Sequence, residues 1–393
     1  MNKQVIYLDN NATTQIDERV LDAMMPFLKD NFANANSTHL FGVESHEAVK
    51  KARRQVADLI SAETNEMVFT SGATEAINLA IKGVAENYEK KGKHIITVST
   101  EHYAVLDTCK YLETKGFEVT YLPVANDGLI NIEDVKLALR HDTILVTVMY
   151  ANNETGVLQN IQEIAEIAHA ADAYFMTDAT QAVGKIPIDV DNMGIDLMCM
   201  SGHKLYGPKG IGALYIRQRN NRIKLPALIH GGGHERGLRS GTLNVPGIVG
   251  LGAACAIAKK EMRQNEQHIK ALRDYLENEL LQIEDTSLNG NKKHRLYNTT
   301  NILFKDVDSD AMIMGLSNME NDLPLIAVSN GSACTSASIE PSHVLTAMGL
   351  NEIDSFSSIR FSIGKFSRIE QIYITIEVVK KCIYELREMI LPI

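Results

Sequence analysis

Between about residues 60 and 220, short apolar runs alternate with stretches of helical pattern. The runs read HIITVST, EVTYLPV, TILVTVMY, AYFMTDAT and GALYIR, and IQEIAEIAHAAD, which lies between two of them, has apolar residues at helical spacing. Strands that alternate with helices form βαβ units, and these units build a mostly parallel, buried sheet. The sequence therefore predicts an α/β fold, with its functional site at the carboxyl ends of the strands.

The rest of the chain predicts a second, smaller domain. The 393 residues exceed the size at which a single core stops growing. A glycine-rich stretch, HGGGHERGLRSGTLN, is followed by a long helical pattern over about residues 248–282, a strand SIRFSI and a final amphipathic helix. We expect a large domain of residues 13–258 and a small α/β domain of residues 1–12 and 259–393.

Composition excludes several classes of protein. The net charge of −10 argues against direct nucleic-acid binding, which requires a basic surface. No apolar run reaches the roughly 18 residues of a membrane-spanning helix. The N-terminus, MNKQVIYLDNNATT, lacks the features of a signal or transit peptide, so we expect a cytoplasmic protein. The five cysteines are scattered without a CxxC motif and predict neither a disulfide framework nor a zinc site.

The stretch TSGATEAINLAIK, residues 70–82, leads from small and hydroxyl residues into a helical pattern. Free N–H groups and the positive end of the helix dipole at such a start favour a phosphate. Taken alone, the stretch fits an ordinary helix start capped by Thr74 at least as well.

Two later motifs also lie at predicted strand ends. In MTDATQAVG, Asp178 could pair with a protonated cofactor ring nitrogen, or it could simply cap a helix. In MSGHKLYGPKGIGALY, Lys204 follows the apolar run IDLMCM. A partly desolvated lysine there can form a Schiff base, and the alternative is a solvated loop lysine. A P-loop is excluded because Pro208-Lys209-Gly210 replaces the GK[ST] that it needs.

The order of these motifs carries more information than any one of them. The full set extends from residue 7 to about residue 366 and reads YLDNNATT, FTSGATEAINLAIKG, TEHYAVLDTC, ANNETG, TDATQAVGK, SGHKLYGPKGIGALY, HGGGHERGLRSGTLN, SNGSACTSASIEPSHVL and SIRFSIGKF. In this order the stretches resemble the group I (NifS/IscS-like) cysteine desulfurases, which are fold-type I pyridoxal 5′-phosphate (PLP) enzymes of the class-V aminotransferase family. The resemblance implies a large domain with a mostly parallel seven-stranded sheet, a smaller C-terminal α/β domain, PLP as the cofactor and L-cysteine as the substrate.

The resemblance also implies roles for single residues. Lys204 would hold PLP as a Schiff base and accept the substrate Cα proton. Asp178 would pair with the pyridine nitrogen, and His102 would stack on the ring and assist proton transfer. Arg360 would bind the substrate carboxylate. The remaining cofactor contacts would come from residues around the phosphate and the phenolic oxygen, namely Ala73, Thr74, Asn153, Gln181, Ser201, His203 and Thr242, with Asn153 also near the substrate.

A homodimer follows from the same resemblance, because Thr242 would reach the cofactor of the other subunit. Cys334, in SNGSACTSASIEP, is surrounded by small residues that place few steric limits on the backbone. As a thiolate it would attack the substrate sulfur, giving L-alanine and a persulfide. The persulfide would pass to an iron–sulfur scaffold or another sulfur-acceptor protein, for cluster assembly or other thio-cofactors. Cys334 could also share an iron–sulfur cluster with the scaffold as a metal ligand. The other four cysteines lie in strand or helix patterns typical of buried thiols.

Some features depart from the family pattern. The early loop reads ANANSTHL, with Ala33 and Ala35 where Gly and Pro are usual, and the segment before Cys334 is longer than usual. The chain ends at Ile393, without the C-terminal tail that helps housekeeping members to dock the scaffold, which leaves the acceptor open. The alternatives are a selenocysteine lyase, another fold-type I lyase or aminotransferase, and a non-catalytic scaffold-binding protein.

Overall fold

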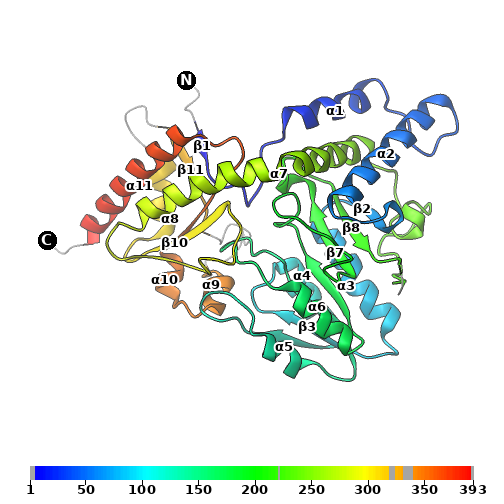
Figure 1. Ribbon diagram of the computed structural model, residues 1–393, viewed down its shortest axis with the longest axis horizontal. Coiled ribbons are helices and arrows are strands. Elements are labelled where there is room, and N and C mark those ends of the chain that lie inside the picture. Colours follow the sequence, from blue (N-terminus) through cyan, green and yellow to red (C-terminus); the bar gives the residue numbers. More distant parts are fainter. Residues whose placement is uncertain (1–4, 220–221, 318–323, 331–339, 391–393) are drawn as a thin grey trace.

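The main sheet has seven strands in the order β2-β8-β7-β6-β5-β3-β4 (Figure 1). The computed structural model describes residues 5–219, 222–317, 324–330 and 340–390. Strand β8 runs antiparallel to both of its neighbours, and the other adjacent pairs are parallel. The strands are β2 (Met67–Thr70), β3 (His94–Val98), β4 (Glu118–Leu122), β5 (Thr143–Thr147), β6 (Tyr174–Asp178), β7 (Leu197–Ser201) and β8 (Gly212–Ile216). The predicted α/β fold with a mostly parallel sheet is confirmed.

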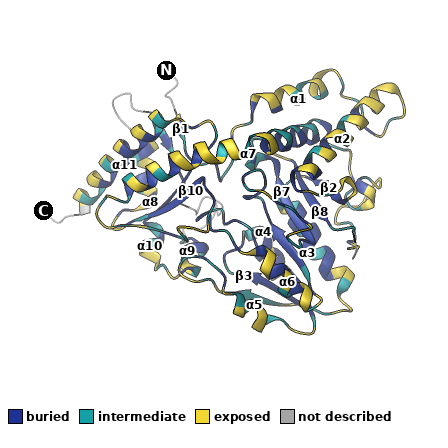
Figure 2. Cartoon of the chain, viewed as in Figure 1, coloured by how far each residue is buried: buried dark blue, intermediate teal, exposed yellow. Residues whose placement is uncertain are grey.

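Helices cover both faces of this sheet because alternate strand residues point to opposite sides. In β7, Leu197 and Cys199 pack into the core that contains the helices α3 (Ala73–Tyr88) and α4 (Tyr103–Glu113). Met198 and Met200 pack into the core on the other face, with α2 (Leu40–Leu59) and α6 (Ile161–Ala170). Figure 2 shows the strands buried while the helices expose their outer sides. The helices α1 (Glu18–Lys29) and α5 (Ile132–Ala138) complete this part of the chain.

The long helix α7 (Val245–Leu280) joins this part to the C-terminal part (Figure 1). Its first half packs against α1 and α2 and joins the core on one face of the main sheet through residues such as Ile248 and Leu251. Its second half packs through Leu272 and Leu276 in a separate core. The helix passes residue 258 without a break, and the predicted domain limits stay a prediction.

The second core is built on two small sheets. One has the order β12-β10-β9 and the other pairs β1 with β11 in parallel, so residues near the N-terminus lie in the C-terminal part. The elements are β1 (Val5–Tyr7), β9 (Thr286–Leu288), β10 (Thr299–Phe304), α8 (Ser309–Ser317), β11 (Leu325–Ala327), α9 (His343–Ala347), α10 (Glu352–Phe356), β12 (Ser358–Ser362) and α11 (Ile369–Ile390). Among the described residues, no helix combines the length and apolar character needed to cross a bilayer.

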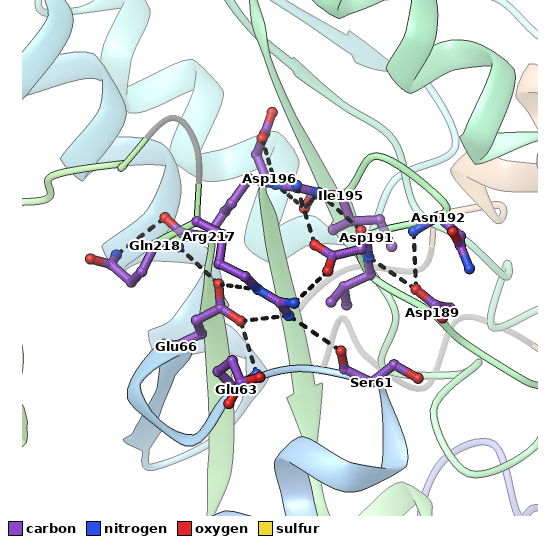
Figure 3. Close-up of polar contacts among 12 residues, drawn as sticks. Ser61, Glu63, Glu66, Asp189, Asp191, Asn192, Ile195, Asp196, Arg217 and Gln218 are labelled. Atoms are coloured by element: carbon purple, nitrogen blue, oxygen red, sulfur yellow. Dashed lines mark hydrogen bonds and ion pairs between the residues drawn. The ribbon is translucent and has the colours of Figure 1, made fainter.

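A polar network closes one end of β2, β7 and β8 (Figure 3). Glu66, which precedes β2 and is fully buried, accepts hydrogen bonds from the backbone N–H groups of Glu63 and Gln218. Arg217, which follows β8, donates to the carbonyl of Ile195 and pairs with Asp196 at 3.2 Å. Buried charges are stable only when they are paired and hydrogen-bonded, and these are. The carboxyl ends of β2 and β7 lie at the opposite end of the sheet, which is where ligand sites of such folds are found.

Candidate active site

A cavity of about 460 Å³ lies at the carboxyl ends of β2, β6 and β7. This volume is in the usual range for small-molecule sites. Segments that follow different strands line the cavity, together with Asn11 and Ala12 near the N-terminus and Ser329 and Arg360 from the C-terminal part. The cavity brings together most of the predicted site residues, namely Ala73, Thr74, His102, Asn153, Asp178, Gln181, Ser201, His203, Lys204 and Arg360.

Lys204 is the last residue of a short 3₁₀ helix, Gly202–Lys204, directly after β7. Its Nζ donates hydrogen bonds to the backbone carbonyls of Ala12, at 2.7 Å, and of Asn11. These carbonyls hold the amine at the cavity wall.

Asp178 is the final residue of β6, and its two carboxylate oxygens have different surroundings. Oδ1 accepts hydrogen bonds from the Thr180 N–H, at 2.9 Å, and from the Cys199 thiol, at 3.2 Å. No hydrogen bond to Oδ2 is found within the described part of the chain, and the residue lines the cavity. Residues 180–185 form turns and not a helix, so the alternative of a helix-capping aspartate is wrong.

The start of α3 meets the cavity without a side-chain cap. Gly72 occupies the N-cap position and makes no side-chain hydrogen bond, so the alternative that Thr74 caps the helix is wrong. The close approach of Gly212 in β8 shapes this turn, because a Cβ at Gly212 would lie 2.7 Å from the Gly72 backbone. The first N–H groups of a helix lack intrahelical partners, which suits them to an anionic group.

His102 is the N-cap of α4, and its Nδ1 accepts a hydrogen bond from the Ala104 N–H at 3.0 Å. Burial lowers the pKa of His102 and outweighs the opposing effect of the Asp178 carboxylate. The ring is therefore neutral near pH 7, with its proton on Nε2. Burial also lowers the pKa of His203, to about 4.

Arg360 reaches the cavity from β12 and is 4% exposed. Its Nη2 contacts Asp9 Oδ1 at 2.6 Å and its Nη1 donates to the Asn153 carbonyl at 3.0 Å. Its Nε is buried and has no partner in the described part of the chain. A buried donor without a partner is costly, so an acceptor brought by a ligand would be favoured here.

Comparison with known proteins adds to this geometry. The family model described as "Aminotransferase class-V" matches residues 6–374. The chain belongs to this family. It is 54% identical over 390 residues to the cysteine desulfurase IscS of Pasteurella multocida (strain Pm70), covering 98% of this chain and 95% of that one.

Solved structures of the family agree with the fold. A NifS-like protein superposes with a TM-score of 0.89 at 37% identity, covering 98% of this chain and 99% of the other. A structure of SspA in complex with cysteine has a TM-score of 0.80 at 40% identity and covers 92% and 99%. The predictions that the chain is a cysteine desulfurase and that its cofactor is PLP are confirmed.

The residues of this class-V cavity fit PLP. The start of α3 suits the phosphate, Asp178 Oδ2, which has no hydrogen bond from the described residues, suits a protonated ring nitrogen, and the amine of Lys204 lies on the same cavity. An anion site, a carboxylate and an amine in one cavity are the groups that this cofactor needs.

The contribution of residues 9–12 was not predicted from the sequence. YLDNNATT belongs to the set of matching stretches, but none of its residues had an expected role. The carbonyls of Asn11 and Ala12 hold Lys204, and Asp9 holds Arg360. The available signal was a polar turn placed directly after a strand-like run.

Thr242 is not part of this cavity lining and is exposed in the segment before α7. An Arg239–Glu75 ion pair, with 2.8 Å between Nε and Oε1, ties this segment to the first turn of α3. Cys334 lies outside the described residues.

The other four cysteines are buried, in α4, β7, α7 and α11, as predicted. Burial raises the pKa of Cys109 and of Cys255 to about 12, and it raises the pKa of Cys199 and Cys382 as well. All four are therefore held as thiols near neutral pH and are poor nucleophiles.

Proposed function

We propose that this cysteine desulfurase transfers the sulfur of L-cysteine to Cys334, using PLP held in the cavity by Lys204. The Sγ of the substrate leaves its carbon and bonds to the Cys334 sulfur, and the products are L-alanine and a persulfide on Cys334. The observation that carries the proposal is the meeting of Lys204, Asp178 and Arg360 in one cavity. The related SspA structure that contains cysteine supports the same substrate.

The chemistry divides between the cofactor and the chain. PLP, when bound, acts as an electron sink that weakens bonds at the substrate Cα. Lys204 would hold the cofactor and take the Cα proton on Nζ. Asp178 Oδ2 would keep the ring nitrogen protonated, and neutral His102 would lie against the ring. Ala73, Thr74, Ser201 and His203 would bind the phosphate.

The charge and burial of Arg360 suit it to the substrate carboxylate, which it would bind beside Asn153. We expect Arg360→Lys to raise the KM for L-cysteine roughly 30-fold or more, because an ammonium cannot form the bidentate contact of a guanidinium. Steady-state kinetics of sulfide release measure this change, with the visible spectrum of the cofactor as the control. An unchanged KM would remove Arg360 from the substrate site.

Persulfide transfer to a partner completes the proposed function. We infer a cytoplasmic homodimer in which Thr242 contributes to the partner subunit's cofactor site. Thr242 is exposed and follows closely after Arg239, which forms an ion pair with Glu75 at the start of α3. The acceptor would be an iron–sulfur scaffold or another sulfur-acceptor protein, and Cys334 would be a shared cluster ligand only in complex with a scaffold.

The test is the product balance of the purified protein with PLP, L-cysteine and a thiol reductant. We expect alanine and sulfide in equal amounts, and no requirement for a keto acid. Alanine formation that depends on a keto acid would indicate an aminotransferase. Faster turnover of L-selenocysteine in the same assay would favour the selenocysteine lyase. A protein that takes up no PLP would contradict the proposal.

A further inference from the structure

A second lysine, Lys185, lies close behind the candidate active site and has no part in the mechanism above. It ends the stretch TDATQAVGK and is only 8% exposed. Together with Lys204 it lines a separate cavity of about 20 Å³, which has room for one water molecule. Lys204 thus borders both the main cavity and the small cavity that Lys185 lines.

Within the described part of the chain, the side-chain hydrogen bonds of Lys185 all go to Gln181. Its Nζ donates to the backbone carbonyl of Gln181 at 2.9 Å and to the side-chain Oε1 of Gln181 at 3.2 Å. No carboxylate pairs with it in the described part of the chain. Burial, together with the charge of Lys204, lowers the pKa of Lys185 to about 7. A buried amine without a counter-ion costs stability, so a purely structural role explains it poorly.

The contact with Oε1 fixes the orientation of the Gln181 amide. Its Nε2 points the other way and donates to the Asn11 carbonyl at 2.9 Å. The same carbonyl accepts a hydrogen bond from Lys204. Lys185, Gln181, Asn11 and Lys204 thus form one chain of hydrogen bonds.

Among the described residues, the second N–H of the Gln181 amide has no acceptor, so it can serve a ligand. An amide nitrogen carries two hydrogens, and the Asn11 carbonyl uses one of them. Gln181 lines the main cavity, where the phenolic oxygen of PLP would need a donor. The N–H of Lys185 donated to Oε1 also polarises the amide and strengthens its N–H groups as donors.

We propose that Lys185 is a positioning residue for the cofactor, which orients and polarises the Gln181 amide so that Nε2 presents an N–H to the phenolic oxygen of PLP. The inference rests on the proposed function, because it requires PLP in the main cavity. It assigns to Lys185 no contact with substrate or cofactor.

The test measures PLP binding to the full-length protein after the cofactor has been removed. We expect Lys185→Met to weaken PLP binding roughly tenfold, the equivalent of about one hydrogen bond, and to shift the visible absorption maximum of the bound cofactor. The stability of the cofactor-free protein should stay equal or rise, because a buried amine without a carboxylate partner in the described part of the chain is replaced by an apolar side chain of similar size. Lys185→Gln supplies a neutral donor, so its PLP affinity should lie between those of the unmodified protein and Lys185→Met.

A double-mutant cycle with Gln181→Leu tests whether Lys185 acts through Gln181. In the Gln181→Leu background, Lys185→Met should weaken PLP binding no further, and additive losses would overturn the proposal. Lys365→Met is the matched control, because Lys365 is also buried but pairs with Asp17. It should lower stability without moving the absorption maximum.

Two other outcomes would overturn the inference. One is a Lys185→Met protein with unchanged PLP affinity and spectrum. The other is a loss of stability in the cofactor-free protein with unchanged PLP binding. Failure of the unmodified chain to bind PLP would instead contradict the proposed function.

Discussion

Replacing Lys204 with alanine is expected to reduce sulfide release from L-cysteine by at least about a thousandfold. The alanine has no amine to hold the cofactor and no base for the substrate Cα proton. The visible band of the lysine-bound cofactor should disappear, because a Schiff base with the protein requires this Nζ. Absorption spectra and sulfide assays on the same samples measure both effects.

The control for this prediction is Lys260→Ala, which removes an exposed lysine of α7 and should leave the spectrum and the rate unchanged. Removing the contacts of Lys204 with the Ala12 and Asn11 carbonyls should cost little stability, because neither acceptor is charged. A Lys204→Ala protein that folds, keeps the band and releases sulfide at the original rate would contradict the assignment.

The sequence predicted the regular elements of the main sheet well. Runs rich in β-branched and aromatic residues became the buried strands β3, β5 and β6, because a strand buried on both faces has few polar positions. The final amphipathic helix expected from the sequence is α11. Helix α2 was not anticipated, although its side chains Val49, Ala52 and Val56 face the core at helical spacing.

The contacts within the cavity were harder to predict. Backbone carbonyls bind the Lys204 amine. Every residue has a backbone carbonyl, so the residue types in the sequence do not reveal such a contact. Arg360 meets Asp9 and Asn153 across separations of 351 and 207 residues, so only the folded chain brings them together. Thr74 offered a plausible cap, but the turn at Gly72 leaves the start of α3 open.

The second large effect is expected for Cys334→Ser. This variant should bind PLP and respond to L-cysteine in the visible spectrum, because Lys204, Asp178 and Arg360 remain. Sulfide release should fall by at least about a hundredfold, since a serine hydroxyl at neutral pH is a far weaker nucleophile than a thiolate. Mass spectrometry without reductant should find one added sulfur atom on Cys334 of the unmodified protein and none on the variant.

The four buried cysteines make this test decisive. Cys109, Cys199, Cys255 and Cys382 are held as thiols within the folded core, so none of them can substitute for a lost nucleophile. Cys382→Ala is the matched control, because it removes a thiol without touching the cavity and should release sulfide normally. Full sulfide release by Cys334→Ser would place the sulfur transfer elsewhere. Normal cofactor binding with lost release would leave Cys334 as the residue that accepts the sulfur.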